Sequence, residues 1–190
     1  AAVNTIRDVG YESYRPQNEA VYPGDDFARA LRQTAALIRA DVGLEAACID
    51  LGGWDTHAAQ GGTSGNFARL LSQLANGLAA FRQDMGDDLK RVTLVVMSEF
   101  GRRLHENASR GTDHGRAGAM LLLSGHLAMP QPVFANWPGL SPERLERGDL
   151  AVTTDYRDVL AEMLNKRMKS NAMEEIFPGY QMQQHGLFLG

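Results

Sequence analysis

The chain has 190 residues, of which 44% are hydrophobic and 22% charged, proportions typical of one globular domain with a sizeable core. Its formal net charge of −4 gives no reason to expect nucleic acid or an anionic membrane as a partner. The longest apolar runs, such as Met120–Leu123, are far too short to cross a bilayer, and no signal peptide is visible.

The first 24 residues are polar and show no hydrophobic period, so we predict an extended N-terminal arm over residues 1–24. Asp25 or Asp26 is expected to cap a helix that runs to about Ala40, because apolar residues recur there at helical spacing. These residues are Phe27, Ala30, Leu31, Thr34, Leu37 and Ile38.

After Gly43, the segment Leu44–Leu51 is rich in small and apolar residues and is predicted to be a strand. It contains the lone Cys48, which we interpret as a small buried hydrophobe and which excludes an intrachain disulfide. A glycine-rich loop follows at 52–65. A second helix is then expected from about residue 66 to 85. Its apolar stripe comprises Phe67, Leu70, Leu71, Leu74, Leu78 and Phe81.

Two further apolar runs, 92–98 and 120–125, have the length of strands covered on both faces. Asp155 is expected to cap a third helix, and residues 171–190 form an irregular tail. The inward face of that helix is predicted to comprise Tyr156, Val159, Leu160, Met163 and Leu164. We therefore predict an α/β domain over 25–170, in which strand–helix alternation implies a mostly parallel sheet with helices on its faces.

The predicted strand at 44–51 leads into "LGGWDTH", which places Asp55 two residues before His57. In an extended loop, residues i and i+2 point the same way, so this pair can present an oxygen and a nitrogen to one ion. The preceding glycines allow close approach of the backbone to a ligand. The alternative is a turn capped by Asp55 with a solvated His57.

Glu99 and Arg102 follow the predicted strand at 92–98, in "SEFGRR". Glu99 is a candidate carboxylate ligand, and Arg102 a candidate cation for an anionic substrate, since the guanidinium fork suits phosphate or sulfate. The alternative is a solvated acid paired with Arg102 or Arg103.

Asp113 and His114 are adjacent in "GTDHG". We predict His114 as a metal ligand and Asp113 as a second ligand or as an orienting group. The alternative is a tight turn between Gly111 and Gly115. Carboxylate and imidazole ligands without thiolate suit Zn²⁺, Mn²⁺ or Mg²⁺, which polarise phosphoryl or sulfuryl oxygens.

Taken together, the motifs "LGGWDTH", "SEFGRR", "GTDHG", "NWPGL" and "TTDYRDVL" resemble the DUF1501 family from about Phe27 to Leu164. These are bacterial proteins of uncharacterised function that are placed with the alkaline phosphatase and sulfatase superfamily. The resemblance implies a three-layer α/β sandwich with a largely parallel central sheet. It also implies a metal-dependent phosphatase or sulfatase site and a periplasmic or exported location.

By this resemblance, Asp55, His57 and His114 hold a first ion and Glu99 serves a second. Phe100 stands where the superfamily usually has a histidine, which leaves the second site short of a ligand. Complete family members are longer, so we expect the nucleophile to precede this chain, and we do not expect these residues to be active alone. The expected substrate is a small anionic ester.

The alternative function is a non-catalytic binding or scaffold protein on the same fold, with remnant metal motifs. A scaffold needs an exposed apolar patch, and the apolar side chains toward the C-terminus are the candidate. They are Met168, Met173, Phe177, Met182 and Phe188. Such a patch would predict a homodimer, or association with a missing N-terminal half.

Overall fold

The structure is a computed structural model that describes residues 10, 11 and 13–190. The part of the predicted arm that falls on residues 1–9 and 12 lies outside the described residues. Contacts divide the chain into two units. The first extends to Leu89 and includes Ala108–Gly111, and the second comprises Lys90–Asn107 and Thr112–Gly190.

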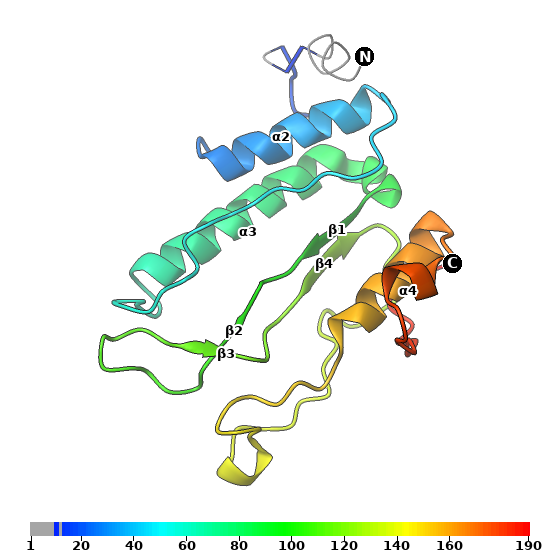
Figure 1. Cartoon of the computed structure of the whole chain (residues 1–190). Helices are drawn as coiled ribbons and strands as arrows, with labels where there is room; N and C mark the ends of the chain where they lie inside the picture. The colour runs from blue at the N-terminus through cyan, green and yellow to red at the C-terminus, as the bar shows by residue number, and fades with distance from the viewer. Residues whose placement is uncertain (1–9, 12) are drawn as a thin grey trace. The chain divides into compact units, whose positions relative to one another are not determined.

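Two helices form the body of the first unit (Figure 1). Helix α2 spans Asp26–Arg39, and its cap is the predicted Asp25, whose carboxylate accepts a hydrogen bond from the Ala28 N–H. Helix α3 spans Asn66–Met85 between two glycines, as predicted. The helices pack closely where Gly77 faces Phe27, since an added Cβ would lie 2.8 Å from that ring.

Residues 44–51 form no strand, so this sequence prediction is wrong. Figure 1 shows the segment as an irregular trace in the connection from α2 to α3. The prediction that Cys48 is buried is also wrong, because its side chain is exposed. The composition of this segment is that of a strand, but a strand requires a hydrogen-bonded neighbour, and no residue of 44–51 is paired within the part of the chain that the structure describes.

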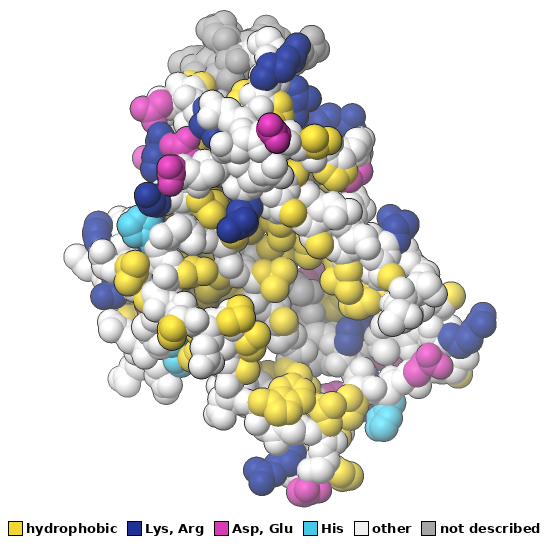
Figure 2. Space-filling view, turned by 180° about the vertical axis from the view of Figure 1, so that it is seen from behind, with side chains coloured by type: hydrophobic (Ala, Val, Ile, Leu, Met, Phe, Trp, Pro, Cys, Tyr) yellow, Lys and Arg dark blue, Asp and Glu magenta, His cyan; other side chains and the backbone are white. Residues whose placement is uncertain are grey.

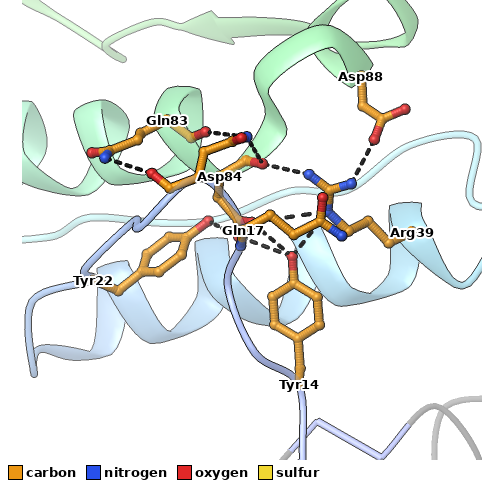
Figure 3. A network of polar contacts seen from close by, with 8 residues as sticks. Tyr14, Gln17, Tyr22, Arg39, Gln83, Asp84 and Asp88 are labelled. Carbon is orange, nitrogen blue, oxygen red and sulfur yellow. Dashed lines mark hydrogen bonds and ion pairs between the residues drawn. The ribbon is translucent and has the colours of Figure 1, made fainter.

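A buried carboxylate ties the polar N-terminal residues to α3 (Figure 3). Asp84 is fully buried, and it accepts hydrogen bonds from the hydroxyls of Tyr14 and Tyr22 and from the Gln17 N–H at 2.8–3.0 Å. Arg39 of α2 lies 3.8 Å from the same carboxylate. A fully buried charge needs such partners, so this network fixes the path of the arm over the helices.

Two small antiparallel sheets begin the second unit, after the 3₁₀ helix η1 at Gly86–Arg91. Strand β1, Thr93–Val96, pairs with β4, Leu121–Ser124. Strand β2, Gly101–Arg102, pairs with β3, His114–Gly115. The apolar runs at 92–98 and 120–125 thus form strands as predicted. They are not covered on both faces, however, because β1 is only half-buried and Leu121 of β4 is exposed. The described residues show no parallel pair, and the parallel central sheet stays a prediction.

Helix α4, Tyr156–Met168, follows its predicted cap Asp155, and its predicted inward face is confirmed in part, because Val159 is buried and Met163 packs against the same cluster. The fully buried positions are Asp158, Val159, Ala161 and Glu162, whereas Tyr156 is 52% exposed. The two carboxylates lie four residues apart, on the side of α4 that holds the C-terminal tail. Short helices η2, Pro142–Arg144, and α5, Met173–Ile176, complete the unit.

The tail closes over α4 through the Glu162 carboxylate, which accepts hydrogen bonds from four successive backbone N–H groups, those of residues 185–188, at 2.6–3.1 Å. As a result Phe188 is buried in a cluster with Val159 and Leu187. Phe188 therefore does not belong to an exposed apolar patch, contrary to the sequence interpretation.

Apolar side chains are nevertheless exposed among the charged ones on the face shown in Figure 2. In the second unit, the exposed large hydrophobic residues include Val133, Phe134, Trp137 and Leu140 of a segment without helix or strand. None of the helices described is both long and apolar enough to span a membrane.

Candidate functional site

Asp55 and His57 form a contact pair in the first unit. The His57 Nε2 atom lies 3.0 Å from the Asp55 Oδ1 atom, so the two side chains point the same way, as their spacing predicts. Both are accessible, with 46% of the His57 side chain and 60% of the Asp55 side chain exposed. The pair thus offers one carboxylate oxygen and one imidazole nitrogen to solvent.

The loop that carries this pair is held at several points. Thr56, between the two candidate ligands, is buried, and its hydroxyl lies 2.8 Å from the Gln60 Oε1 atom. The backbone N–H groups of Ala59 and Gln60 donate to the carbonyls of Ser109 and Arg110, both at 2.9 Å. The segment 108–111 therefore belongs to the structure that positions Asp55 and His57.

Gly111 is packed against the backbone of this loop. A Cβ atom at Gly111 would overlap the carbonyl groups of Thr56 and His57. Only glycine allows this approach without displacement of the loop. Trp54, which precedes Asp55, packs edge-on against Phe67 of α3, with ring centroids 5.9 Å apart.

In the second unit, His114 lies on β3 opposite Arg102 on β2. The imidazole of His114 stacks on Phe100, with centroids 4.1 Å apart and planes 11° from parallel. The Arg102 guanidinium lies 4.7 Å from the centroid of the same Phe100 ring and donates to the Thr112 carbonyl at 2.5 Å. One aromatic ring thus contacts both a predicted ligand and the predicted substrate-binding cation.

The other two candidates differ in their surroundings. Asp113 accepts a hydrogen bond from the Asn107 amide at 3.0 Å, which orients its carboxylate. Glu99 is exposed and pairs with neither Arg102 nor Arg103 among the described residues. Arg103 instead lies 3.2 Å from Asp149. The exposure of Glu99 agrees with the solvated acid of the alternative interpretation.

The structure thus brings together Asp55 with His57, and Arg102 with His114 through Phe100. The sequence analysis noted Phe100 only because it stands where a metal-binding histidine is usual. It predicted neither the stacking of Phe100 on His114 nor the contact of Gly111 with the loop. The register that sets Gly101 opposite Gly115 accounts for the first omission, since it brings Phe100 near His114. Two short strands of two residues each are too brief to be recognised from periodicity.

An Asp–His pair with a further histidine has the ligand chemistry of a divalent metal site, since Zn²⁺ and Mn²⁺ accept imidazole nitrogen and carboxylate oxygen. Solvent reaches both Asp55 and His57. The residues present therefore fit such a group by their donor types.

Comparison with known proteins gives one result. No curated protein matches the chain, and no solved structure does. The family model described as a protein of unknown function, DUF1501, matches residues 11–176, which include every candidate discussed above. The chain therefore belongs to the DUF1501 family.

Proposed function

We propose that this chain contributes the metal ligands of a metal-dependent hydrolase of phosphate or sulfate esters, related to the alkaline phosphatase and sulfatase superfamily, and that hydrolysis takes place in the full-length protein. The observation that carries the proposal is the Asp55–His57 pair, whose nitrogen and oxygen lie 3.0 Å apart on an accessible but well-anchored loop. In this proposal Asp55, His57 and His114 hold one divalent ion.

Covalent connection supports the inclusion of His114. Gly111 lies against the backbone of His57, and His114 follows Gly111 by three residues. Three residues of extended chain span at most about 11 Å, so the chain itself keeps His114 within reach of the loop. Ligand atoms must approach an ion to about 2.0–2.2 Å, so a His114 kept near the loop is a requirement of the proposed site.

The remaining candidates have secondary roles. A bound ion would polarise the ester oxygen and stabilise charge that develops on it. Arg102 binds the anionic group of the substrate, and its contact with Phe100 limits the directions that its guanidinium can take. Asp113 orients its neighbour His114, and Glu99 is available to a second ion.

Hydrolysis of 4-nitrophenyl phosphate and 4-nitrophenyl sulfate by the full-length protein, with Zn²⁺, Mn²⁺ or Mg²⁺ supplied in turn, tests the proposal. We expect turnover of at least one ester to disappear in His57→Ala and to persist in His105→Ala, since His105 is exposed and is no candidate ligand. Metal-loaded full-length protein that hydrolyses neither ester would overturn the hydrolase proposal and favour the non-catalytic binding protein. Equal activity in both variants would exclude His57 from the site.

A further inference from the structure

A polar pocket lies within the second unit, apart from all the residues assigned above. Its volume is about 280 Å³, just below the range of about 300–1,000 Å³ for small-molecule sites. The start of α4 and the C-terminal tail contribute its walls. The lining residues are Val152, Thr153, Thr154, Asp155, Asp158, Tyr180, Gln183 and His185.

The pocket is a built feature, because hydrogen bonds to one buried carboxylate hold its two walls together. The side chain of Asp158 is 5% exposed, and its Oδ1 atom accepts from the Tyr180 hydroxyl at 2.8 Å and from the Gln183 N–H at 2.7 Å. Its Oδ2 atom faces the His185 Nε2 atom at 3.3 Å. A carboxylate only accepts, so Nε2 is the donor, and in the neutral imidazole Nδ1 is left as an acceptor.

Several neutral polar groups of the lining have no partner of their own. The side chains of Thr153, Thr154 and Gln183 form no hydrogen bond with any residue that the structure describes. With the Nδ1 atom of His185, they present both donors and acceptors toward one space. Such a mixed set suits a ligand that itself has several hydroxyl groups.

The charges of the lining disfavour two other ligand classes. An anion would meet Asp155 and Asp158, while the nearby Arg157 is already bound to Asp155 at 2.8 and 3.0 Å and covers the Tyr180 ring. A small metal ion would find the Asp158 oxygens occupied by the donors of the tail. A neutral ligand meets neither obstacle.

An exposed aromatic ring adjoins the polar lining. Phe134 is 44% exposed, and its centroid lies 5.1 Å from that of His185. A sugar has hydroxyls around its edge and a C–H face on each side, so it uses polar groups and an aromatic surface at the same time. Phe134 beside the hydroxyl- and amide-lined pocket offers this combination.

We propose that this pocket binds a neutral saccharide, with Gln183, Thr153 and His185 on its hydroxyl groups and Phe134 against its C–H face. The proposal is independent of the metal site, since none of these residues is a candidate ligand. With few contacts and an open polar site, a monosaccharide binds in the millimolar range.

Titration of ¹⁵N-labelled protein with glucose and with N-acetylglucosamine, followed by NMR, tests this inference. We expect saturable shifts of the amides of residues 153–154 and 183–185. Binding should weaken at least tenfold in Gln183→Ala and in Phe134→Ala. It should persist in Gln184→Ala, a matched control whose exposed side chain does not line the pocket.

The Gln183→Ala variant is expected to fold, because Gln183 is exposed and its side chain forms no hydrogen bond with any described residue. An unchanged NMR spectrum outside the pocket verifies this. Absence of saturable shifts with both sugars would overturn the proposal. So would equal weakening in Gln183→Ala and Gln184→Ala, or equal shifts produced by inorganic phosphate.

Discussion

The ring of Phe100 lies parallel to the imidazole of His114, 4.1 Å from it, and so limits the orientation of the proposed metal ligand. We expect Phe100→Leu to weaken metal binding about 3–10-fold, because a stacked aromatic pair contributes about 0.5–1.5 kcal/mol beyond its buried area. Phe100→Tyr keeps the ring and should bind metal as the wild type does. Competition with a chromophoric chelator measures both, and equal affinities of the two variants would exclude an orienting role for Phe100.

Replacement of Gly111 by alanine tests the anchoring of the Asp55–His57 loop. The added Cβ would overlap the backbone of Thr56 and His57, so the loop must move. We expect the variant to lose metal affinity while both helices of the first unit persist, as circular dichroism would show. Gly62→Ala is the matched control, since nothing lies within 4 Å of an added Cβ there. Unchanged metal affinity in Gly111→Ala would show that loop position does not matter.

The Glu162 carboxylate is expected to be a major source of stability in the second unit. Glu162→Gln replaces one acceptor oxygen by an amide N–H₂ group, which then faces backbone donors of the tail. The expected loss is about 2–4 kcal/mol in the free energy of unfolding, because charged hydrogen bonds are lost and buried donors are left unpaired. The control Glu175→Gln, at an exposed position, should change the free energy of unfolding by less than about 0.5 kcal/mol.

Chemical denaturation measures the two changes, and proteolysis locates the effect. We expect the Glu162→Gln variant to be cleaved first within residues 180–189, because the tail is released from α4. Equal stability of the two variants would contradict the account of the tail.

The buried network around Asp84 predicts a loss of stability in alkali. Burial, together with hydrogen bonding to Asp84 and its charge, raises the pKa of Tyr14 to about 12, and the same causes raise the pKa of Tyr22. In the unfolded chain a tyrosine has a pKa of about 10. Between pH 10 and 12 the unfolded chain therefore releases protons that the folded chain keeps, so stability falls over this window and is fully present below it.

Urea denaturation at several pH values between 9 and 12 measures this effect, with the Tyr14→Phe variant as comparison. The variant lacks one of the groups that titrates, so its stability should decline less steeply over the window. Identical slopes in the wild type and the variant would mean that Tyr14 is not linked to folding in this way.

The helices were predictable because their signals are local. Asp25, Asp155 and the glycines at 65 and 86 mark helix ends within a few residues, and the apolar period lies between them. The strand prediction for 44–51 failed because apolar composition does not supply a pairing partner. Pairing depends on residues far away in sequence, which periodicity does not report.

In the candidate site, too, only contacts between residues close in sequence could be predicted. The approach of Asp55 to His57 follows from their spacing alone. The stacking of Phe100 on His114 depends on the register of β2 and β3, and the buried carboxylates of α4 depend on a tail about 25 residues away. A sequence pattern that assigns charged residues to the solvent side of a helix misses such positions.

We propose that Asp55, His57 and His114 hold one ion, and the metal content of the protein measures this. The protein is loaded with Zn²⁺ or Mn²⁺, desalted and analysed by elemental analysis, together with His57→Ala, His114→Ala and the control His105→Ala. The account predicts one ion per chain in the wild type and the control, and its loss in both of the other variants. A wild type that retains no metal, or loss in only one of the two variants, would contradict it.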